Sequence, residues 1–212
     1  MIVAMLADDD LKAEIIGKGY NNAVEVIWVD SIQSLRIIEA DAYFDLLFEN
    51  NIERIARLKF LLPKPLFVNA VITTGKELPE GFIRINAWPT MLKRKLVEVA
   101  AADGEEGSIK NIKYIFDMMG WEFQVVPDIT GMITPRIISM IINEAWFSVS
   151  ENVSTREEID TAMKLGTNYP YGPFEWGEKI GLNYIRDLLN ELQKTDMRYI
   201  IAPGLQGEFK WH

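Results

Sequence analysis

The chain has 212 residues, of which 49% are hydrophobic and 25% are charged, a composition typical of a folded domain rather than a disordered segment. Lysine and arginine total 22 against 31 aspartates and glutamates, and the resulting net charge of -9 argues against a nucleic-acid-binding surface. There is no cysteine, and the single histidine is the last residue, His212, which excludes disulfides, thiolate chemistry and multi-histidine metal sites.

The beginning of the chain carries an apolar run, residues 2–6, that is too short for a membrane span or a signal peptide. Acidic residues rather than basic ones follow it. We therefore expect a cytoplasmic protein that does not associate with a membrane.

The first part of the chain predicts alternating strands and helices. A strand over residues 2–6, a helix ending at Gly17 or Gly19 and a strand over residues 24–30 form a βαβ unit. Further strands are expected over residues 40–49, 66–71, 83–89, 96–100 and 124–128, with helices within residues 31–39 and over 51–62 and 108–119. This order predicts an α/β fold.

The remainder of the chain is helical in pattern. Thr134 is expected to N-cap a helix that begins with Pro135 and runs to about Val149. This helix is apolar almost all round, which predicts burial inside the domain or against a second subunit. Ser154 and Glu157 have the spacing of a capping box that opens the next helix.

Glycines are expected to end two of the later helices. Gly166 is expected to end the helix that follows Ser154, and Gly181 a short helix that starts at Pro173. A last amphipathic helix carries Leu182, Ile185, Leu188, Leu189 and Leu192.

The residue order in this helical part resembles a known family. Residues 159–166, Ile-Asp-Thr-Ala-Met-Lys-Leu-Gly, followed by Gly-Pro-Phe-Glu at residues 172–175, are similar to the C-terminal domain of the 3-hydroxyacyl-CoA dehydrogenases, and the match extends over residues 130–199. The resemblance implies a Rossmann-like domain over residues 1–126 and an all-helical domain over residues 127–212. It also implies NAD as the cofactor, an acyl-CoA ligand and a homodimer formed through the helical domain.

The nucleotide-binding turn of such a domain is altered in this chain. The glycines of G-x-G-x-x-G fall at Ala7, Asp9 and Lys12, so all three are replaced. The carboxylates at residues 8–10 would repel a diphosphate by about 1 kcal/mol per charge pair in water and by more near a protein surface. They equally suit an N-cap with first-turn acids, and a metal site is a third interpretation. Asp30 falls where the family has its ribose-binding acid, although a turn residue is the alternative.

The connection after Asp30 is also shortened. Between residues 30 and 40 only a short helix fits, where the family carries a helical hairpin that clasps the CoA moiety. The resemblance therefore implies an abbreviated first domain.

Hydride transfer from a secondary alcohol needs a base, usually a histidine oriented by a carboxylate. The family's "H-F-F-N-P … L-V-E-V" corresponds here to residues 86–89, Asn-Ala-Trp-Pro, and 96–99, Leu-Val-Glu-Val. Glu98 matches, but Asn86 stands at the base position, and an amide accepts no proton near neutral pH. The family's catalytic serine falls near Val71, and the asparagine of its "F-x-x-N-R" helix start falls at Pro135.

Loss of the base alone typically lowers a rate by a factor of about a hundred to ten thousand. We therefore expect a degenerate 3-hydroxyacyl-CoA dehydrogenase-like pseudoenzyme without a cofactor, which serves as a binding or scaffold protein with residual acyl-CoA affinity. One alternative is an active short NAD-dependent enzyme of fatty-acid or butanoate metabolism that uses Glu98 and Asn86. Another is a dimeric structural protein with a vestigial cleft. For Glu98 itself, a structural ion pair with Arg84 or Lys95 is the alternative to catalysis.

Overall fold

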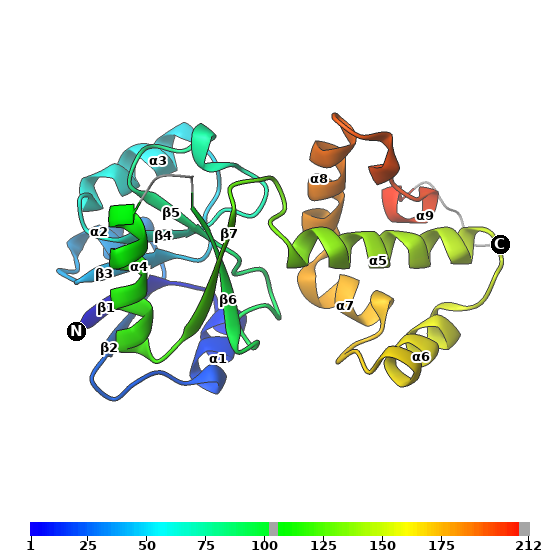
Figure 1. The fold of residues 1–212 in the computed structure, drawn as a ribbon, viewed down its shortest axis with the longest axis horizontal. Coiled ribbons are helices and arrows are strands. Elements are labelled where there is room, and N and C mark those ends of the chain that lie inside the picture. The colour runs from blue at the N-terminus through cyan, green and yellow to red at the C-terminus, as the bar shows by residue number, and fades with distance from the viewer. Residues whose placement is uncertain (102–105, 208–212) are drawn as a thin grey trace. The chain divides into compact units, whose positions relative to one another are not determined.

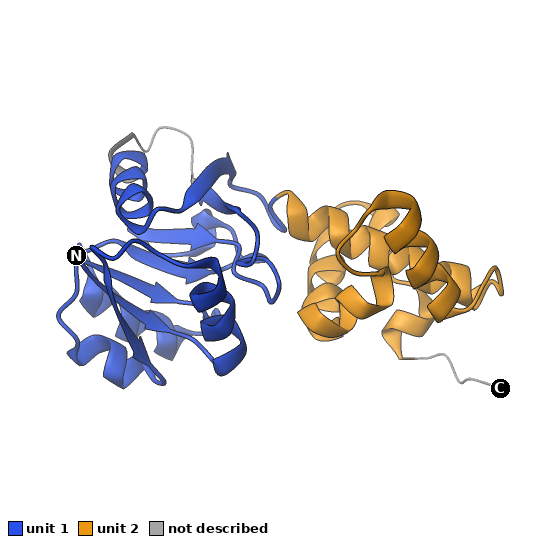
Figure 2. Cartoon of the chain, turned by 90° about the horizontal axis from the view of Figure 1, so that it is seen from below, with its two compact units in different colours: residues 1–132 blue, residues 133–212 orange. Residues whose placement is uncertain are grey.

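The computed structural model describes residues 1–101 and 106–207. It divides the chain into two compact units, Met1–Met132 and Ile133–His212 (Figure 2). The first unit extends beyond residue 126 because the segment after its last strand stays bonded to it. The amide of Gly131 donates to the carbonyl of Val71 at 2.8 Å, and the amide of Gly75 donates to the carboxylate of Asp128.

The first unit is built on one mostly parallel sheet, which confirms the expected α/β, Rossmann-like class (Figure 1). In the described part of the chain this sheet has seven strands in the order β2-β1-β3-β4-β5-β6-β7, and only β5 and β6 pair in antiparallel fashion. The strands are β1 (Ile2–Leu6), β2 (Glu25–Val29), β3 (Ala42–Asp45), β4 (Leu66–Asn69), β5 (Phe82–Ile85), β6 (Leu96–Ala101) and β7 (Glu122–Pro127).

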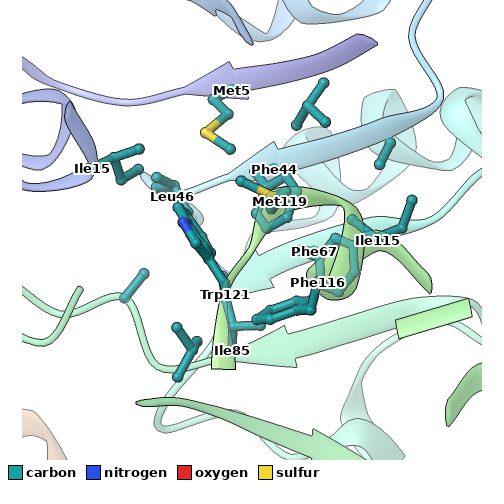
Figure 3. Close-up of a cluster of buried hydrophobic side chains, with 14 of the residues drawn as sticks. Met5, Ile15, Phe44, Leu46, Phe67, Ile85, Ile115, Phe116, Met119 and Trp121 are labelled. Atoms are coloured by element: carbon teal, nitrogen blue, oxygen red, sulfur yellow. The ribbon is translucent and has the colours of Figure 1, made fainter. Parts of the chain in front are cut away.

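Helices cover both faces of this sheet because side chains alternate along each strand. On one face Val3, Phe44 and Phe67 pack with α1 (Asp9–Lys18) and α4 (Glu106–Met119), in the cluster that Figure 3 shows. Phe44 and Phe67 stack there with ring centroids 4.4 Å apart. On the other face Ala4 and Tyr43 pack with α2 (Ile32–Ile37), α3 (Ile52–Leu58) and the 3-10 turn η1 (Lys59–Leu61). A second 3-10 turn, η2 (Gly75–Glu77), follows β4.

The shortened connection from α2 to β3 is fastened by side chains. The hydroxyl of Tyr43 donates to the carbonyl of Ile38 at 2.9 Å and accepts from the amide of Ala40 at 3.2 Å. Lys64 Nζ donates to the carbonyl of Ala40 at 2.7 Å. The first unit is thus an abbreviated Rossmann-like domain in which side chains satisfy the carbonyls of Ile38 and Ala40 and the amide of Ala40 at the short connection.

The second unit is all helical, as expected. Its elements are α5 (Thr134–Ser150), α6 (Arg156–Thr167), α7 (Pro173–Ile180), α8 (Leu182–Gln193), η3 (Met197–Tyr199) and α9 (Pro203–Gln206). Gly181 ends α7 with a φ of 100°, and Ile185, Leu188, Leu189 and Leu192 form the buried stripe of α8.

Three expected helix ends are wrong by one or two residues. Thr134 is the first helical residue of α5, and Ile133 occupies its N-cap. The capping box of α6 is Thr155 with Glu158, one residue later than expected, and the hydroxyl of Ser154 also bonds Glu158. The left-handed residue after α6 is Asn168 rather than Gly166, because asparagine tolerates that conformation too.

The helix α5 is less completely buried than its composition predicts. Ile138, Ile142 and Trp146 lie in the core, whereas Ile137 is 55% exposed. Trp88, Trp146 and Trp176 are buried. Among the described helices, none combines the length and the apolar character that a bilayer crossing requires.

Candidate functional site

The carboxyl ends of β1, β3, β4 and β5 lie along one edge of the sheet because these strands run parallel. In open α/β sheets, ligands bind outside this edge. The residues that follow these strand ends are Ala7, Leu46, Ala70 and Asn86, so the edge brings together the turn, the Val71 segment and the base position that the sequence singled out.

At the end of β1 the acidic turn caps α1. Asp8 has an extended backbone, with φ -78° and ψ 176°, and its Oδ1 accepts from the amide of Leu11 at 2.9 Å. Asp9 and Asp10 stand in the first helical turn and are exposed. A diphosphate at this turn would compete with the Asp8 carboxylate for the helix amides and would meet two further negative charges. These residues do not fit the diphosphate of a dinucleotide.

Asp30 lies just after β2, at the neighbouring position of the same edge. It is exposed, and its Oδ1 accepts from the hydroxyl of Ser34 at 3.4 Å, next to Ser31, which N-caps α2. This is the geometry of a turn residue. Within residues 1–101 and 106–207, no group of three or more histidine, cysteine or acidic side chains is placed to hold a metal ion.

The structure brings the two predicted catalytic positions together. Asn86 Nδ2 donates to Glu98 Oε2 at 3.1 Å, and the amide of Asn86 donates to the carbonyl of Glu98 at 3.0 Å. Both residues are buried, with 3% and 5% of their surface exposed. His212, the histidine of the sequence, lies outside the described residues. The pair consists of one carboxylate and one amide that are bonded to each other.

The alternative ion pairs expected for Glu98 are wrong. Arg84 pairs instead with Asp128, and Lys95 Nζ lies 2.6 Å from Glu122 Oε1. The register of β5 with β6 sets Arg84 opposite Ala100 and Ile85 opposite Val99, which leaves Asn86 opposite Glu98. The antiparallel register therefore selects the partner of Glu98.

The connection from β5 to β6 is mostly buried, apart from the exposed residues 93–95, and side chains of other elements hold it in place. Asn69, at the end of β4, accepts from the amide of Ala87 at 3.0 Å and donates to its carbonyl at 3.2 Å. Lys18, at the end of α1, donates to the carbonyls of Arg94 and Lys95. The loop that carries Asn86 is thus fixed from both β4 and α1.

Glu14 also holds this loop in place, and it was not predicted from the sequence. It is 7% exposed, and its Oε1 accepts from the amide of Thr90 at 2.6 Å. Burial raises the pKa of the Glu14 carboxyl, although the Thr90 amide and Lys93 oppose the rise. Thr90 has φ 75°, a left-handed conformation that is rare for a β-branched residue. The signal in the sequence was the position of Glu14 beside Ile15, three residues after Leu11, on the apolar face of α1.

The turn after β4, where the family's serine would stand, is occupied by a buried ion pair. Arg84 is 1% exposed, its Nε donates to the carbonyl of Ala70 at 2.9 Å and its Nη2 donates to that of Val71 at 3.1 Å. Its Nη1 bonds Asp128. This pair was not anticipated from the sequence, and it places a guanidinium against the carbonyls of the Val71 turn.

A second buried ion pair lies at the end of β3. Asp45 is fully buried and accepts from Arg54 Nε at 2.8 Å and Nη2 at 2.6 Å. Burial raises the pKa of the Asp45 carboxyl, and the bonds from Arg54 oppose this. Such a bidentate pair orients α3 against the sheet.

Comparison with known proteins identifies relatives of this chain. Residues 131–206 match the family model described as 3-hydroxyacyl-CoA dehydrogenase, C-terminal domain. The chain is 39% identical over 100 residues to 3-hydroxyadipyl-CoA dehydrogenase of Escherichia coli, an alignment that covers 47% of this chain and 21% of the relative. It is 32% identical to 3-hydroxybutyryl-CoA dehydrogenase of Clostridioides difficile over 63% of this chain and 49% of the relative.

The whole chain also has a related fold among solved structures. It superimposes on (S)-3-hydroxybutyryl-CoA dehydrogenase from Ralstonia eutropha with a TM-score of 0.73 and 18% identity, covering 97% of this chain and 92% of that one. This likeness concerns the fold. The chain spans about half or less of the length of the curated relatives that it matches first.

Proposed function

Since the chain belongs, through residues 131–206, to the 3-hydroxyacyl-CoA dehydrogenase family, we propose that it is a dehydrogenase-like protein that no longer transfers hydride. In this proposal it acts as a binding or scaffold protein with residual affinity for acyl-CoA. It functions in the cytoplasm and requires no NAD.

The observation that carries the proposal is the Asn86–Glu98 pair. The family's base position holds an amide that donates to Glu98 at 3.1 Å, and an amide cannot take the hydroxyl proton that leaves when an alcohol is oxidised. Val71 and Pro135, at two further family positions, bring no side-chain donor or acceptor for a substrate.

The turn before α1 supports the same proposal. The helix amide that a diphosphate would use is already bonded to Asp8, and the neighbouring carboxylates repel an anion. Without a bound dinucleotide there is no hydride acceptor, whatever base the site provides.

A calorimetric titration with NADH tests the proposal, together with an assay of NAD-dependent turnover of 3-hydroxybutyryl-CoA. We expect no heat at millimolar NADH and no turnover. Micromolar NADH binding with turnover would overturn the proposal in favour of an active short dehydrogenase that uses Glu98 and Asn86.

The Asn86→His variant distinguishes loss of the catalytic base from loss of cofactor binding. It restores an imidazole beside Glu98 but leaves Asp8 and Asp9 in the turn, so we expect it to remain inactive. Turnover by this variant would show that the cofactor binds and that only the base was lost.

Titration of the wild-type chain with acetoacetyl-CoA tests the residual acyl-CoA affinity directly. Absence of binding would leave a structural role for the protein.

We also propose a homodimer that forms through the helical unit. Large apolar side chains stand exposed there, with Leu165 at 83% and Val153 at 68%. Burying such side chains against a second copy would remove apolar surface from water. Sedimentation velocity tests this: we expect a dimer for the wild type and a monomer for Leu165→Glu, and a wild-type monomer at high concentration would contradict it.

A further inference from the structure

The strand β2 lies at one edge of the sheet and is apolar. Among the strands that the structure describes, β2 pairs with β1 alone, so its outer side carries backbone groups without a neighbouring strand. Its sequence is Glu-Val-Ile-Trp-Val, and the four residues that follow Glu25 are all partly exposed. It contains neither proline nor lysine, which commonly protect such an edge. An edge of this kind favours pairing with another strand.

The opposite edge of the sheet is protected. β7 ends at Pro127, which has no amide hydrogen to donate, and its exposed residues include Glu122 and Gln124. Glu122 is also engaged with Lys95, whose Nζ lies 2.6 Å from its Oε1. Of the two edges, β2 is therefore the one that presents an unbroken apolar run to a partner strand.

The ladder with β1 fixes which residues of β2 face outward. The amide of Glu25 donates to the carbonyl of Met1 at 2.9 Å, on the side of β1. Successive residues of a strand direct their amide and carbonyl groups to opposite sides, so Ile27 and Val29 also face β1. Val26 and Trp28 then direct their amides and carbonyls to the open edge.

The two helices next to β2 extend inward from this edge. α1 connects β1 to β2, and α2 connects β2 to β3 across β1, so neither connection passes outside β2. Leu11 and Ile15 of α1 pack in one cluster with Val3 and Met5 of β1, and α2 contacts β1 as well as β2. This chain path leaves the outer side of β2 open to a strand.

We propose that two copies of this chain pair through β2 in antiparallel fashion, with the two-fold axis at Ile27. In this register Val26 lies opposite the partner's Trp28, and the outward amide and carbonyl of each residue bond those of the other. The axis repeats this pair, so every outward backbone group of β2 between Glu25 and Val29 gains a partner. The two seven-stranded sheets then become one continuous sheet.

Charge and packing favour this register over its neighbours. With the axis at Ile27, Glu25 lies opposite Val29 and the ring of Trp28 opposite Val26, and pairs of an aromatic and a β-branched side chain stabilise a sheet. An axis at Glu25 would set two carboxylates opposite each other. An axis at Trp28 would set Val26 opposite Asp30, which lies beyond the end of the strand.

This contact differs from the homodimer proposed for the helical unit. It uses the first unit, and it consists of one short strand on each side, so it is the weaker of the two and forms at higher protein concentration. Its test therefore uses the Leu165→Glu variant, in which the proposed helical contact is removed and association through β2 is observed by itself.

Disulfide trapping tests the register, because the chain contains no cysteine of its own. Ile27→Cys, added to Leu165→Glu, places a thiol at the axis, where the two Cα atoms lie about 4.5 Å apart, within the range of a disulfide. Glu25→Cys is the matched control, since its two copies would be separated by four residues of strand, about 13 Å. We expect Ile27→Cys to form the covalent dimer at least about tenfold faster than Glu25→Cys under mild oxidation.

The control also distinguishes pairing from random collision. Glu25 is the more exposed of the two positions, so collision alone would oxidise Glu25→Cys first. Equal rates for the two variants, or a faster rate for Glu25→Cys, would overturn the proposal.

A charge at the axis tests the contact without a covalent bond. Ile27→Lys sets two ammonium groups opposite each other and should abolish the association of Leu165→Glu that we expect in sedimentation equilibrium at near-millimolar concentration. Ile52→Lys is the control: Ile52 is 89% exposed at the start of α3, which follows β3, so the association should persist. An unchanged circular dichroism spectrum shows that each variant is folded. Absence of association of Leu165→Glu at this concentration, or its persistence in Ile27→Lys, would contradict pairing through β2.

Discussion

Thr90 is the residue at which the buried loop before β6 departs most from ordinary backbone geometry. Its φ of 75° is sterically unfavourable for a β-branched side chain and costs on the order of 1–3 kcal/mol of stability. The conformation persists because Glu14 and the packing of Met91 and Leu92 determine the path of the loop. The strain therefore lies within the segment that presents Asn86 to Glu98.

We expect Thr90→Gly to stabilise the protein by about 1 kcal/mol, because glycine adopts positive φ without a steric cost. Urea denaturation measures the change. Thr74→Gly serves as the control: Thr74 has an ordinary φ of -83° and caps the η2 turn, so glycine there should destabilise. A loss of stability in Thr90→Gly would mean that the threonine side chain contributes more than its backbone strain costs.

The raised pKa of Glu14 predicts that the stability of the protein depends on pH. Because burial raises its pKa in the folded state above the ordinary value of 4.5, the stability that it contributes is fully present below the unfolded pKa and is lost as pH rises through the folded pKa. Glu14→Gln keeps an acceptor for the Thr90 amide and carries no charge. We expect the variant to gain stability relative to the wild type as pH rises from about 4 to 7.

Thermal melts at several pH values check this expectation. Glu14→Ala, which also removes the acceptor for Thr90, should be less stable than the wild type throughout that range. A difference between the wild type and Glu14→Gln that does not change with pH would contradict the expectation.

At the scale of the elements, the acidic turn before α1 acts as a helix cap. Asp8 satisfies the Leu11 amide, and Asp9 and Asp10 add negative charge at the positive end of the helix. We expect Asp8→Ala to destabilise the protein by about 1 kcal/mol in urea denaturation. Asp9→Ala removes a carboxylate that makes no cap bond and should cost about half as much or less. Equal effects would mean that Asp8 acts only through its charge.

The order and type of these elements could be predicted from the sequence because apolar periodicity and turn residues act locally. The exact ends of the helices could not be predicted from the sequence. The run Ser154-Thr155-Arg156-Glu157-Glu158 offers two capping boxes one residue apart, and local chemistry does not distinguish them. Gly166 and Asn168 are likewise both acceptable left-handed residues, and the left-handed conformation occurs at Asn168, with φ 57°.

Two residues of the candidate site could be named from the sequence, but the contacts between its side chains could not. Asn86 and Glu98 could be aligned by motif, whereas their contact depends on the register of β5 with β6. The Arg84–Asp128 pair joins residues 44 positions apart through the fold of the sheet. A pattern read along the chain reports periodicity, not which charged side chains meet across such separations.

At the scale of the whole molecule, the second unit has a core of its own. Side chains that are nearly inaccessible come from α5, α7 and α8, and they include Ile142, Phe174, Ile180, Ile185, Leu188 and Leu189. Side chains also connect its segments: Asp160 accepts from the amides of Phe174 and Glu175, and Asn143 bonds Ile200 and Ala202. A domain of this size with a packed core can fold alone, although marginally.

We therefore expect residues 133–212, produced separately, to show helical circular dichroism and a cooperative thermal transition. Ile185→Asp, which buries a charge at a position with 0% exposure, should abolish the transition, whereas Leu165→Asp at 83% exposure should retain it. A fragment that melts without cooperativity would show that this unit needs residues 1–132 to fold. A fragment that folds would show that the core formed by α5, α7 and α8 assembles without residues 1–132.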